Sequence, residues 1–295
     1  MEEEMIVAIE RRPQIKILDR IVGPISDAGF KVIRCDSPMH SRVTKLPNCN
    51  VIVVFNGTHP KYNKIIKQAK NRNIKVIYIE LGWLPQRPYN QVDFSGINAD
   101  ASWVNNKLPD RQYLPLKLRN NNKLLVPLQN DRDVSIRCQS PWFADMFGFL
   151  KHLKKCSCMH IVVRKHPRHA KKTDKQILKF VANNRKISWD KSATFLDALK
   201  GVRAVATVNS TAGLEAINAG YPVLCYGRAV YRREDVAICL ENSKDDSKAA
   251  IKAIKHGDVS LNRANLQSFV KLVKSKQIHR KKTANVIISM LQGLR

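Results

Sequence analysis

Short apolar runs rich in β-branched residues alternate with helix-like stretches along most of this 295-residue chain. Residues 50–55 (NVIVVF) and 75–80 (KVIYIE) are two such runs, and residues 62–71 between them have helical periodicity. Strands that are apolar on both faces lie between helix layers, so this pattern is typical of parallel sheets in α/β proteins. The length suits two domains of ordinary size. The expected fold class is therefore α/β.

Two series of strand-like runs indicate two Rossmann-like lobes. The polar stretch 117–123 (KLRNNNK) separates them and is the expected linker. We expect an N-terminal lobe over residues 1–118 and a C-terminal lobe over residues 119–295, whose amphipathic stretch 261–294 supplies terminal helices. Ligands of such folds bind at the carboxyl ends of strands, so a site in a cleft between the lobes is predicted.

The chain is strongly basic, with 52 Lys and Arg against 24 Asp and Glu and a net charge of +28. This charge indicates an anionic partner, either nucleic acid or anionic lipid and acidic glycan. The sequence has no zinc-finger, RNP or basic-zipper motif, and its basic clusters lack the interleaved aromatics of a base-stacking platform. Nucleic acid is therefore disfavoured, and peripheral contact with an anionic membrane remains an alternative.

The location expected from the sequence is cytoplasmic, including the inner face of the membrane. No apolar run approaches the roughly 18 residues that span a bilayer. The amino terminus (MEEEM) is acidic, which is the wrong polarity for a secretory signal.

The strongest local signal is residues 208–216 (VNSTAGLEA), which follow a strand and open a helix. Ser210 and Thr211 leave the backbone N–H groups unhindered, and the helix dipole there favours a phosphate. Glu215, one turn later, could accept hydrogen bonds from ribose hydroxyls. The alternative is an ordinary serine N-cap with Gly213 packed on the sheet. The Gly-x-Pro strand that follows is common in nucleotide-sugar transferases and favours the first interpretation.

A basic turn, residues 164–168 (RKHPR), follows the strand over residues 160–163. Pro167 ends the strand and places His166 at its carboxyl edge. Arg164 and Lys165 add cations that suit a diphosphate, a monophosphate or a sugar carboxylate. The alternative is a solvated basic turn.

A metal site is not expected. His160, His166 and His169 suggest zinc, but Pro167 interrupts their spacing and no acidic residue is near. The pair in residues 156–158 (CSC) has the wrong spacing for a zinc knuckle.

Two further loops supply carboxylates. The loop 126–136 (VPLQNDRDVSI) carries Asp131 and Asp133, and a carboxylate there can attack an anomeric carbon or stabilise oxocarbenium charge. The alternative role is helix capping. Glu80 ends a strand and opens residues 80–86 (ELGWLPQ), where it could accept a proton from an acceptor hydroxyl. The alternative there is a turn whose tryptophan lies at the lobe interface.

In this order, the four segments resemble the capsule polysaccharide synthesis family that includes the bacterial β-Kdo transferases. That family repeats a Glu-x-Gly-Trp-x-Pro-Gln loop, a Gln-x-x-x-Asp-x-Ser-Ile loop, a His-Pro pair and an Asn-Ser-Thr-Ala-Gly-x-Glu-Ala helix start on a GT-B fold. The corresponding residues here are 80–86, 129–136, 166–167 and 209–216, and the resemblance spans roughly residues 75–230.

The resemblance implies a retaining glycosyltransferase whose N-terminal lobe binds a glycan or glycolipid acceptor and whose C-terminal lobe binds a nucleotide sugar, a CMP-Kdo-type donor. No metal or other cofactor is expected. Asp133 would be the nucleophile and Glu80 the base that activates the acceptor. The implied donor-binding residues are Gln129, Arg164, Lys165, His166, Asn209, Ser210, Thr211 and Glu215. His166, Ser210 and Thr211 would hold the phosphate and the sugar carboxylate, and Glu215 the ribose.

Several alternatives stay open. Asp131 lies two residues from Asp133, so either could be the nucleophile. Residues 228–233 (RAVYRR) depart from the family's aromatic and glycine-rich continuation, which leaves the sugar open. A GT-B transferase or epimerase with a UDP- or GDP-sugar is the second hypothesis, and a basic nucleic-acid-binding protein is the third.

Overall fold

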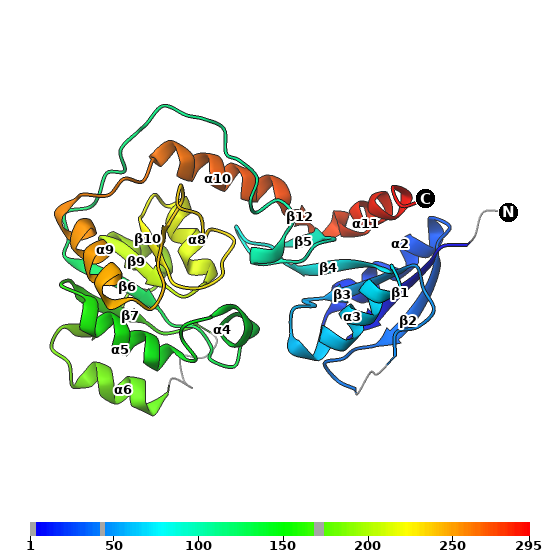
Figure 1. Cartoon of the computed structure of the whole chain (residues 1–295), viewed down its shortest axis with the longest axis horizontal. Coiled ribbons are helices and arrows are strands. Elements are labelled where there is room, and N and C mark those ends of the chain that lie inside the picture. The colour runs from blue at the N-terminus through cyan, green and yellow to red at the C-terminus, as the bar shows by residue number, and fades with distance from the viewer. Residues whose placement is uncertain (1–3, 42–44, 168–173) are drawn as a thin grey trace. The chain divides into compact units, whose positions relative to one another are not determined.

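The computed structural model describes residues 4–41, 45–167 and 174–295 (Figure 1). The chain divides into two compact units. The first contains Met1–Asn106 together with Val273–Arg295, and the second contains Lys107–Leu272. Each has its own sheet and its own core.

The first unit is built on a six-stranded sheet in the order β12-β5-β4-β3-β1-β2. The parallel strands are β1 (Ile6–Arg11), β2 (Lys31–Asp36), β3 (Val51–Phe55) and β4 (Lys75–Leu81). The antiparallel additions are β5 (Tyr89–Asp93) and β12 (Ile278–His279). β3 and β4 match the apolar runs expected over residues 50–55 and 75–80. β5 was not expected, because its sequence (YNQVD) lacks an apolar run, and its short connection from β4 allows only antiparallel pairing.

Helices cover both faces of the first sheet, because β1 and β3 alternate their side chains between two cores. Val7 and Val53 face α1 (Lys16–Arg20), α2 (Val22–Asp27) and α11 (Thr283–Gln292), whereas Ala8 and Val54 face α3 (Asn63–Asn71). The helical segment between β1 and β2 is divided into α1 and α2 close to its Gly-Pro pair. The short 3₁₀ turns are η1 (Pro60–Tyr62), η2 (Asn98–Asp100) and η4 (Arg280–Lys282).

The second unit has six parallel strands in the order β11-β10-β9-β6-β7-β8. The strands are β6 (Lys123–Pro127), β7 (His160–Arg164), β8 (Ile187–Trp189), β9 (Ala204–Thr207), β10 (Val223–Cys225) and β11 (Ile238–Cys239). The helices are α4 (Val134–Gln139), α5 (Met146–Cys156), α6 (Lys175–Ala182), α7 (Phe195–Lys200), α8 (Thr211–Asn218), α9 (Lys244–His256) and α10 (Arg263–Lys276). The chain moves outward from β6 to β8, returns to place β9 beside β6, and moves outward again. This is the strand order of dinucleotide-binding folds.

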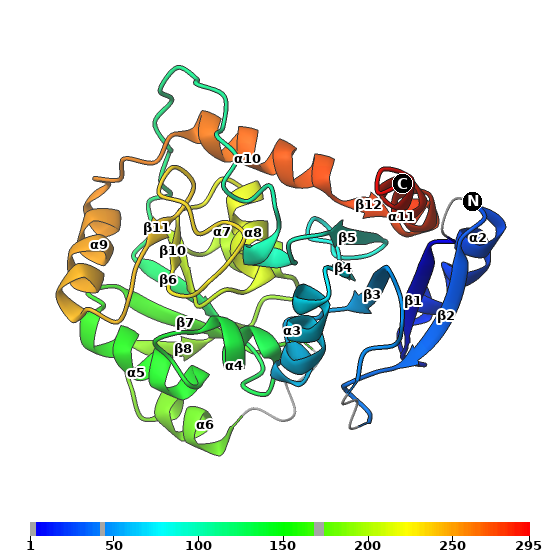
Figure 2. The same ribbon diagram turned by 45° about the vertical axis from the view of Figure 1, so that its right-hand side comes forward.

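The division into units differs from the expected one at the carboxyl end. The terminal helices were assigned to the second lobe, but residues 273–295 belong to the first unit. β12 pairs with β5, and Ile287 and Leu291 of α11 are fully buried in the first core. The chain therefore passes between the units twice, once near residue 106 and once within α10 (Figures 1 and 2).

The expected linker, residues 117–123, lies inside the second unit. Residues 107–122 form an arc beside the amino-terminal end of α10, where Pro115 makes a β-bridge with Asn262 (Figure 2). The Arg263 backbone N–H also donates to the Leu114 carbonyl at 2.8 Å. We call residues 107–122 the strap.

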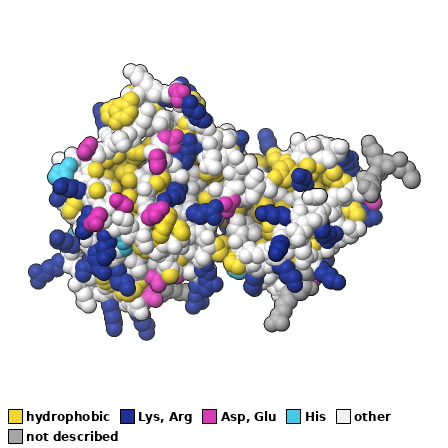
Figure 3. Space-filling view, in the orientation of Figure 1, with side chains coloured by type: hydrophobic (Ala, Val, Ile, Leu, Met, Phe, Trp, Pro, Cys, Tyr) yellow, Lys and Arg dark blue, Asp and Glu magenta, His cyan; other side chains and the backbone are white. Residues whose placement is uncertain are grey.

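Lys and Arg side chains are spread over the surface of both units (Figure 3). In the second unit they gather over α5 and α6, where Lys151, Lys154, Lys155 and Lys179 are exposed. Within the described residues, no helix combines the length and the apolar character needed to cross a membrane.

Ile287 tests whether α11 belongs to the first core. We expect Ile287→Ala to lower the free energy of unfolding by about 2–5 kcal/mol, because it removes a fully buried side chain and leaves a cavity. Denaturant titration measures this change. Asn285→Ala, at an exposed position of the same helix, is the control and should change the value little. Equal effects of the two substitutions would contradict the packing of α11.

Candidate functional site

Three neighbouring strands of the second sheet end close to predicted site residues. Gln129, His166 and Asn209 each lie two residues beyond the last residue of β6, β7 and β9. These strands are parallel and adjacent in the order β9-β6-β7, so all three residues follow the carboxyl edge of one sheet. The chain reverses its strand order between β6 and β9, which is where folds of this type bind nucleotides.

Hydrogen bonds join the ends of β6 and β9 directly. The Gln129 side-chain amide donates to the Asn209 Oδ1 at 2.8 Å and to the Ser135 hydroxyl at 3.3 Å. Its carbonyl oxygen accepts from the Asn209 backbone N–H at 3.2 Å. The Asn209 amide donates to the Ser135 carbonyl at 2.7 Å and to the Gln139 carbonyl at 3.1 Å. We call these four residues the Gln129–Asn209 network. It ties the loop after β6, the helix α4 and the start of α8 together.

The start of α8 has the serine N-cap and the closely packed glycine that its sequence allows. Ser210 is the N-cap, and its hydroxyl accepts from the Ala212 backbone N–H at 3.2 Å. The Tyr231 hydroxyl donates to the Ser210 carbonyl at 2.6 Å. A Cβ added to Gly213 would lie 2.4 Å from the Tyr231 hydroxyl oxygen, so this close approach requires glycine. Thr211, the first helical residue, then follows the cap at the carboxyl edge of the sheet.

The cations after β7 are held by specific partners. Arg164 forms an ion pair with Asp190, and its guanidinium also donates to the Ser192 carbonyl at 3.1 Å. Burial alone raises the pKa of Asp190, but hydrogen bonds from Ser192 and the charge of Arg164 bring it below its ordinary value. The Lys165 ammonium lies 4.9 Å from the centre of the Trp189 ring. The predicted Arg168 and His169 lie outside the described residues.

Glu215 lies in α8, one turn beyond Ser210, and is half-buried. Burial raises the pKa of this carboxyl above its ordinary value, and the positive charge of Arg164 opposes the rise. The interaction places Glu215 within the electrostatic reach of the basic turn after β7.

The two candidate nucleophiles have different surroundings. Asp131 is half-buried, and its carboxylate accepts from the Met146 backbone N–H at 2.8 Å, at the start of α5. Burial raises the pKa of Asp131. Asp133 is exposed and caps α4 by accepting from the Ser135 N–H at 3.0 Å through Oδ1. Its Oδ2 has no hydrogen-bond partner among the described residues. Asp131 is therefore fixed to α5, whereas Asp133 keeps one oxygen accessible.

Glu80 belongs to the first unit, near the carboxyl end of β4. Its Oε2 accepts from the Asn56 side-chain amide at 2.8 Å, and its Oε1 accepts from the Leu81 N–H at 2.8 Å. Trp83 packs inside the same unit, with its ring 5.2 Å from that of Trp103. Its indole N–H donates to the Asn98 Oδ1 at 3.3 Å, and Trp103 and Asn98 both belong to the first unit.

Sequence reasoning missed Glu10, which is fully buried near the carboxyl end of β1. Its carboxylate accepts from the hydroxyls of Ser37 and Tyr62, and from the Phe55 backbone N–H at 2.8 Å. Burial, together with the nearby Glu10 carboxylate, raises the pKa of Tyr62. An acidic residue within an apolar strand (IVAIER) is the signal that could have identified it.

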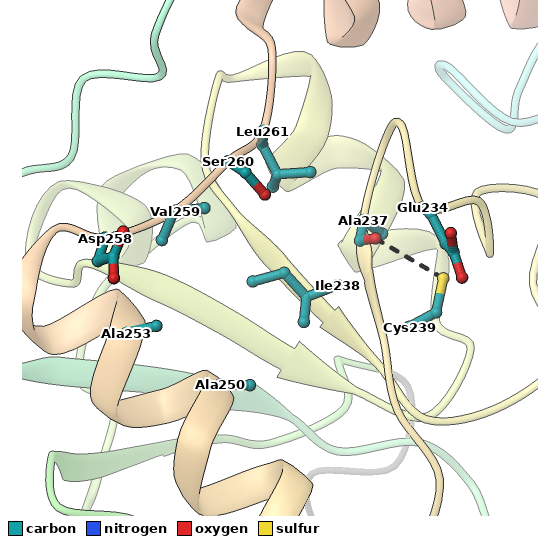
Figure 4. Close-up of a pocket in the computed structure, with 10 residues that line it drawn as sticks. All are labelled: Glu234, Ala237, Ile238, Cys239, Ala250, Ala253, Asp258, Val259, Ser260 and Leu261. Atoms are coloured by element: carbon teal, nitrogen blue, oxygen red, sulfur yellow. Dashed lines mark hydrogen bonds between the residues drawn. The ribbon is translucent and has the colours of Figure 1, made fainter.

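A cavity of about 290 Å³ lies between β11 and the carboxyl-terminal half of α9 (Figure 4). Its lining contains none of the predicted site residues. The Glu234 and Asp258 carboxylates lie at opposite ends of it, and no Lys or Arg lines it (Figure 4). These charges do not suit an anionic nucleotide. Among the described residues, no three His, Cys, Asp or Glu side chains are grouped as metal ligands would be.

The fold and this edge define a GT-B-like protein with two Rossmann-type units. The sequence profile described as "Capsule polysaccharide biosynthesis protein" matches residues 105–271, more than half of the chain. The chain belongs to this capsule polysaccharide biosynthesis family.

Known proteins extend the comparison. Protein FixF of Sinorhizobium fredii (strain NBRC 101917 / NGR234) is 24% identical over an alignment of 213 residues, and the match covers 64% of this chain and 51% of FixF. The chain thus spans about half of the length of that relative.

Two solved structures share the fold. The β-Kdo 2,4 transferase of Thermosulfurimonas dismutans KpsC has a TM-score of 0.60 at 14% identity, covering 97% of this chain and 99% of that chain. The β-Kdo 2,7 transferase of the same KpsC has a TM-score of 0.54 at 16% identity, covering 98% and 99%. Both confirm the expected GT-B-like fold class.

Proposed function

We propose that this chain is a glycosyltransferase of capsule polysaccharide biosynthesis that binds a nucleotide-activated sugar at the carboxyl edge of its second sheet. The observation that carries the proposal is the Gln129–Asn209 network, which joins two of the predicted motifs at the strand-order reversal. The family and the fold shared with β-Kdo transferases support the same conclusion.

The donor that we propose is a CMP-linked Kdo or a related acidic sugar. The start of α8 offers backbone N–H groups and the positive end of a helix dipole to the phosphate. Arg164 is the last residue of the neighbouring strand β7, and Lys165 and His166 follow it. These three residues would balance the charges of the phosphate and the sugar carboxylate. Glu215 would accept from the ribose hydroxyls. A UDP- or GDP-sugar is the second candidate donor.

Gln129 and Asn209 act, in this proposal, as positioning residues. Their amide N–H groups donate to protein oxygens, so they shape the loops that meet the donor. Ser210 and Thr211 lie next to Asn209 in sequence and would contact the phosphate.

The proposed reaction is a double displacement with retention. The Asp133 carboxylate attacks the anomeric carbon as the bond to the CMP phosphate breaks, and CMP leaves with the bonding electron pair. Glu80 then takes the proton of an acceptor hydroxyl, whose oxygen attacks the same carbon and releases Asp133. The acceptor is a glycan or glycolipid, and the scheme uses no metal. The proposed location is cytoplasmic, at the inner membrane face when the acceptor is lipid-linked.

Nucleotide choice tests the donor. We expect CMP at about 100 times its dissociation constant to stabilise the chain by about 2.7 kcal/mol, because it binds only the folded state. UDP and GDP at equal concentration should stabilise it less. Thermal unfolding with each nucleotide, and with a DNA duplex at several salt concentrations, measures this. Stabilisation by UDP or GDP alone would select the second donor class, and salt-sensitive DNA binding without any nucleotide effect would refute the enzyme.

The nucleophile can be assigned with two isosteric substitutions. Asp133→Asn should lower turnover by a factor on the order of 10³ or more, because an amide cannot attack the anomeric carbon while it still caps α4. CMP stabilisation should persist. Asp131→Asn is the matched control and should retain most of the turnover. If Asp131→Asn is inactive and Asp133→Asn active, the two roles are reversed.

Glu80→Gln tests the proposed base. Turnover should fall by about 10²–10⁴-fold, since glutamine cannot take the proton, while donor affinity stays close to that of the wild type. Initial rates at varied donor concentration separate the two effects. Unchanged turnover would remove Glu80 from acid–base chemistry.

A further inference from the structure

A second hollow of the second unit, of about 350 Å³, lies away from the proposed donor site. Its walls come from the strap, the residues just before β9 and β10, and the first residue of α10. It therefore lies at the amino-terminal ends of the parallel strands, whereas Gln129, His166 and Asn209 follow their carboxyl ends. We call it the strap pocket.

The strap pocket is cationic. Lys117, Arg119, Arg203 and Arg263 line it, and no Asp or Glu does. None of these four side chains forms an ion pair with any residue that the structure describes. Four like charges around one hollow repel each other, and an anion between them removes that repulsion.

Two of the arginines are held in place before any ligand arrives. The Arg119 guanidinium stacks over the Tyr221 ring, 5.2 Å from its centre. Arg203 donates from Nε to the Ile254 carbonyl at 2.6 Å and from Nη1 to the Arg119 carbonyl at 2.8 Å. Ordering these side chains beforehand lowers the entropic cost of binding an anion.

The carboxyl end of α8 also reaches this pocket, and its carbonyls would repel an anion if they were unbonded. Two of these carbonyls, those of Ala216 and Ile217, are instead bonded within the turn that ends the helix. Gly220, with a positive φ of 78°, lets its own N–H donate to the Ile217 carbonyl and lets the Tyr221 N–H donate to the Ala216 carbonyl.

From these observations we propose that the strap pocket is a second anion site, distinct from the donor site, that binds a phosphate-bearing ligand. Its volume suits a diphosphate or a sugar phosphate, and guanidinium groups bind phosphate oxygens in pairs. The phosphate has two possible sources, a soluble molecule or a lipid headgroup. Tyr113 and Leu114, just before the pocket residues of the strap, are 55% and 46% exposed and would contact the bilayer in the lipid case.

Calorimetric titration of the full chain with inorganic pyrophosphate, at constant ionic strength, tests the site. The doubly substituted variant Arg119→Gln and Arg263→Gln should bind at least about tenfold more weakly, because two charge-assisted contacts are lost. The matched control is Arg185→Gln with Lys186→Gln, which removes equal charge from the exposed turn before β8 at the same edge of the sheet. This control should bind as the wild type does.

Saturating CMP separates this proposal from the donor site. Pyrophosphate should still bind in its presence, and Asp133→Asn should not change that binding. Three results would each overturn the proposal. They are an equal loss of pyrophosphate affinity in the two double variants, no loss of affinity in the variant with Arg119→Gln and Arg263→Gln, and displacement of pyrophosphate by CMP. The two double variants can be compared even if the chain binds no nucleotide. A failure of the proposed glycosyltransferase function can therefore be distinguished from a failure of the strap pocket.

Sedimentation with phosphatidylcholine vesicles, with and without phosphatidic acid, separates the two sources. Binding that requires phosphatidic acid, Arg119, Arg263 and Tyr113 supports the lipid source. Pyrophosphate binding without vesicle binding supports the soluble source. Vesicle binding that is insensitive to the arginines, together with no pyrophosphate binding, would refute the pocket.

Discussion

The side chain of Gln129 holds together the point where the second sheet reverses its strand order. The connections that follow two neighbouring strands at such a reversal run in opposite directions and leave a crevice at the carboxyl ends of the strands. The hydrogen bonds between the strands do not fix the loops on either side of this crevice. The paired carboxamides of Gln129 and Asn209 provide that fixation, and they extend it to α4 through the Ser135 and Gln139 carbonyls. The capping residue Asp133 and the start of α8 therefore take their positions from one small hydrogen-bond network.

The first sheet has a corresponding device of different chemistry. Its strand order reverses between β1 and β3, and the buried Glu10 carboxylate joins the end of β1 to the Phe55 N–H of β3 and to the hydroxyls of Ser37 and Tyr62. A buried carboxylate is tolerated there because donors surround it. The amides of Gln129 and Asn209 connect the strand ends in the second sheet, and the Glu10 carboxylate connects them in the first. Both are polar groups that stabilise a particular loop arrangement more than they add to the core.

The parallel strands could be predicted from sequence because each is an apolar run between helical stretches. β5 and β12 could not, since the buried residues of β5 are polar, β12 has only two residues, and their pairing depends on contacts across almost 190 residues of chain. The motif positions after β6, β7 and β9 were also predictable, because turn chemistry and strand ends are local. The partners of those residues were not, because the contacts of Gln129 with Asn209 and of Arg164 with Asp190 come from the folded topology.

The chain passes between its units near residue 106, where the strap begins, and again within α10, and this has a consequence for a molecule cut in the strap. A single cut within residues 107–122 would leave one fragment that carries the second sheet together with β12 and α11. That fragment still completes the first unit, through the β5–β12 pairing and the burial of Ile287 and Leu291. The two pieces would thus remain associated by complementation, in the way that a split protein reassembles, although no peptide bond joins them.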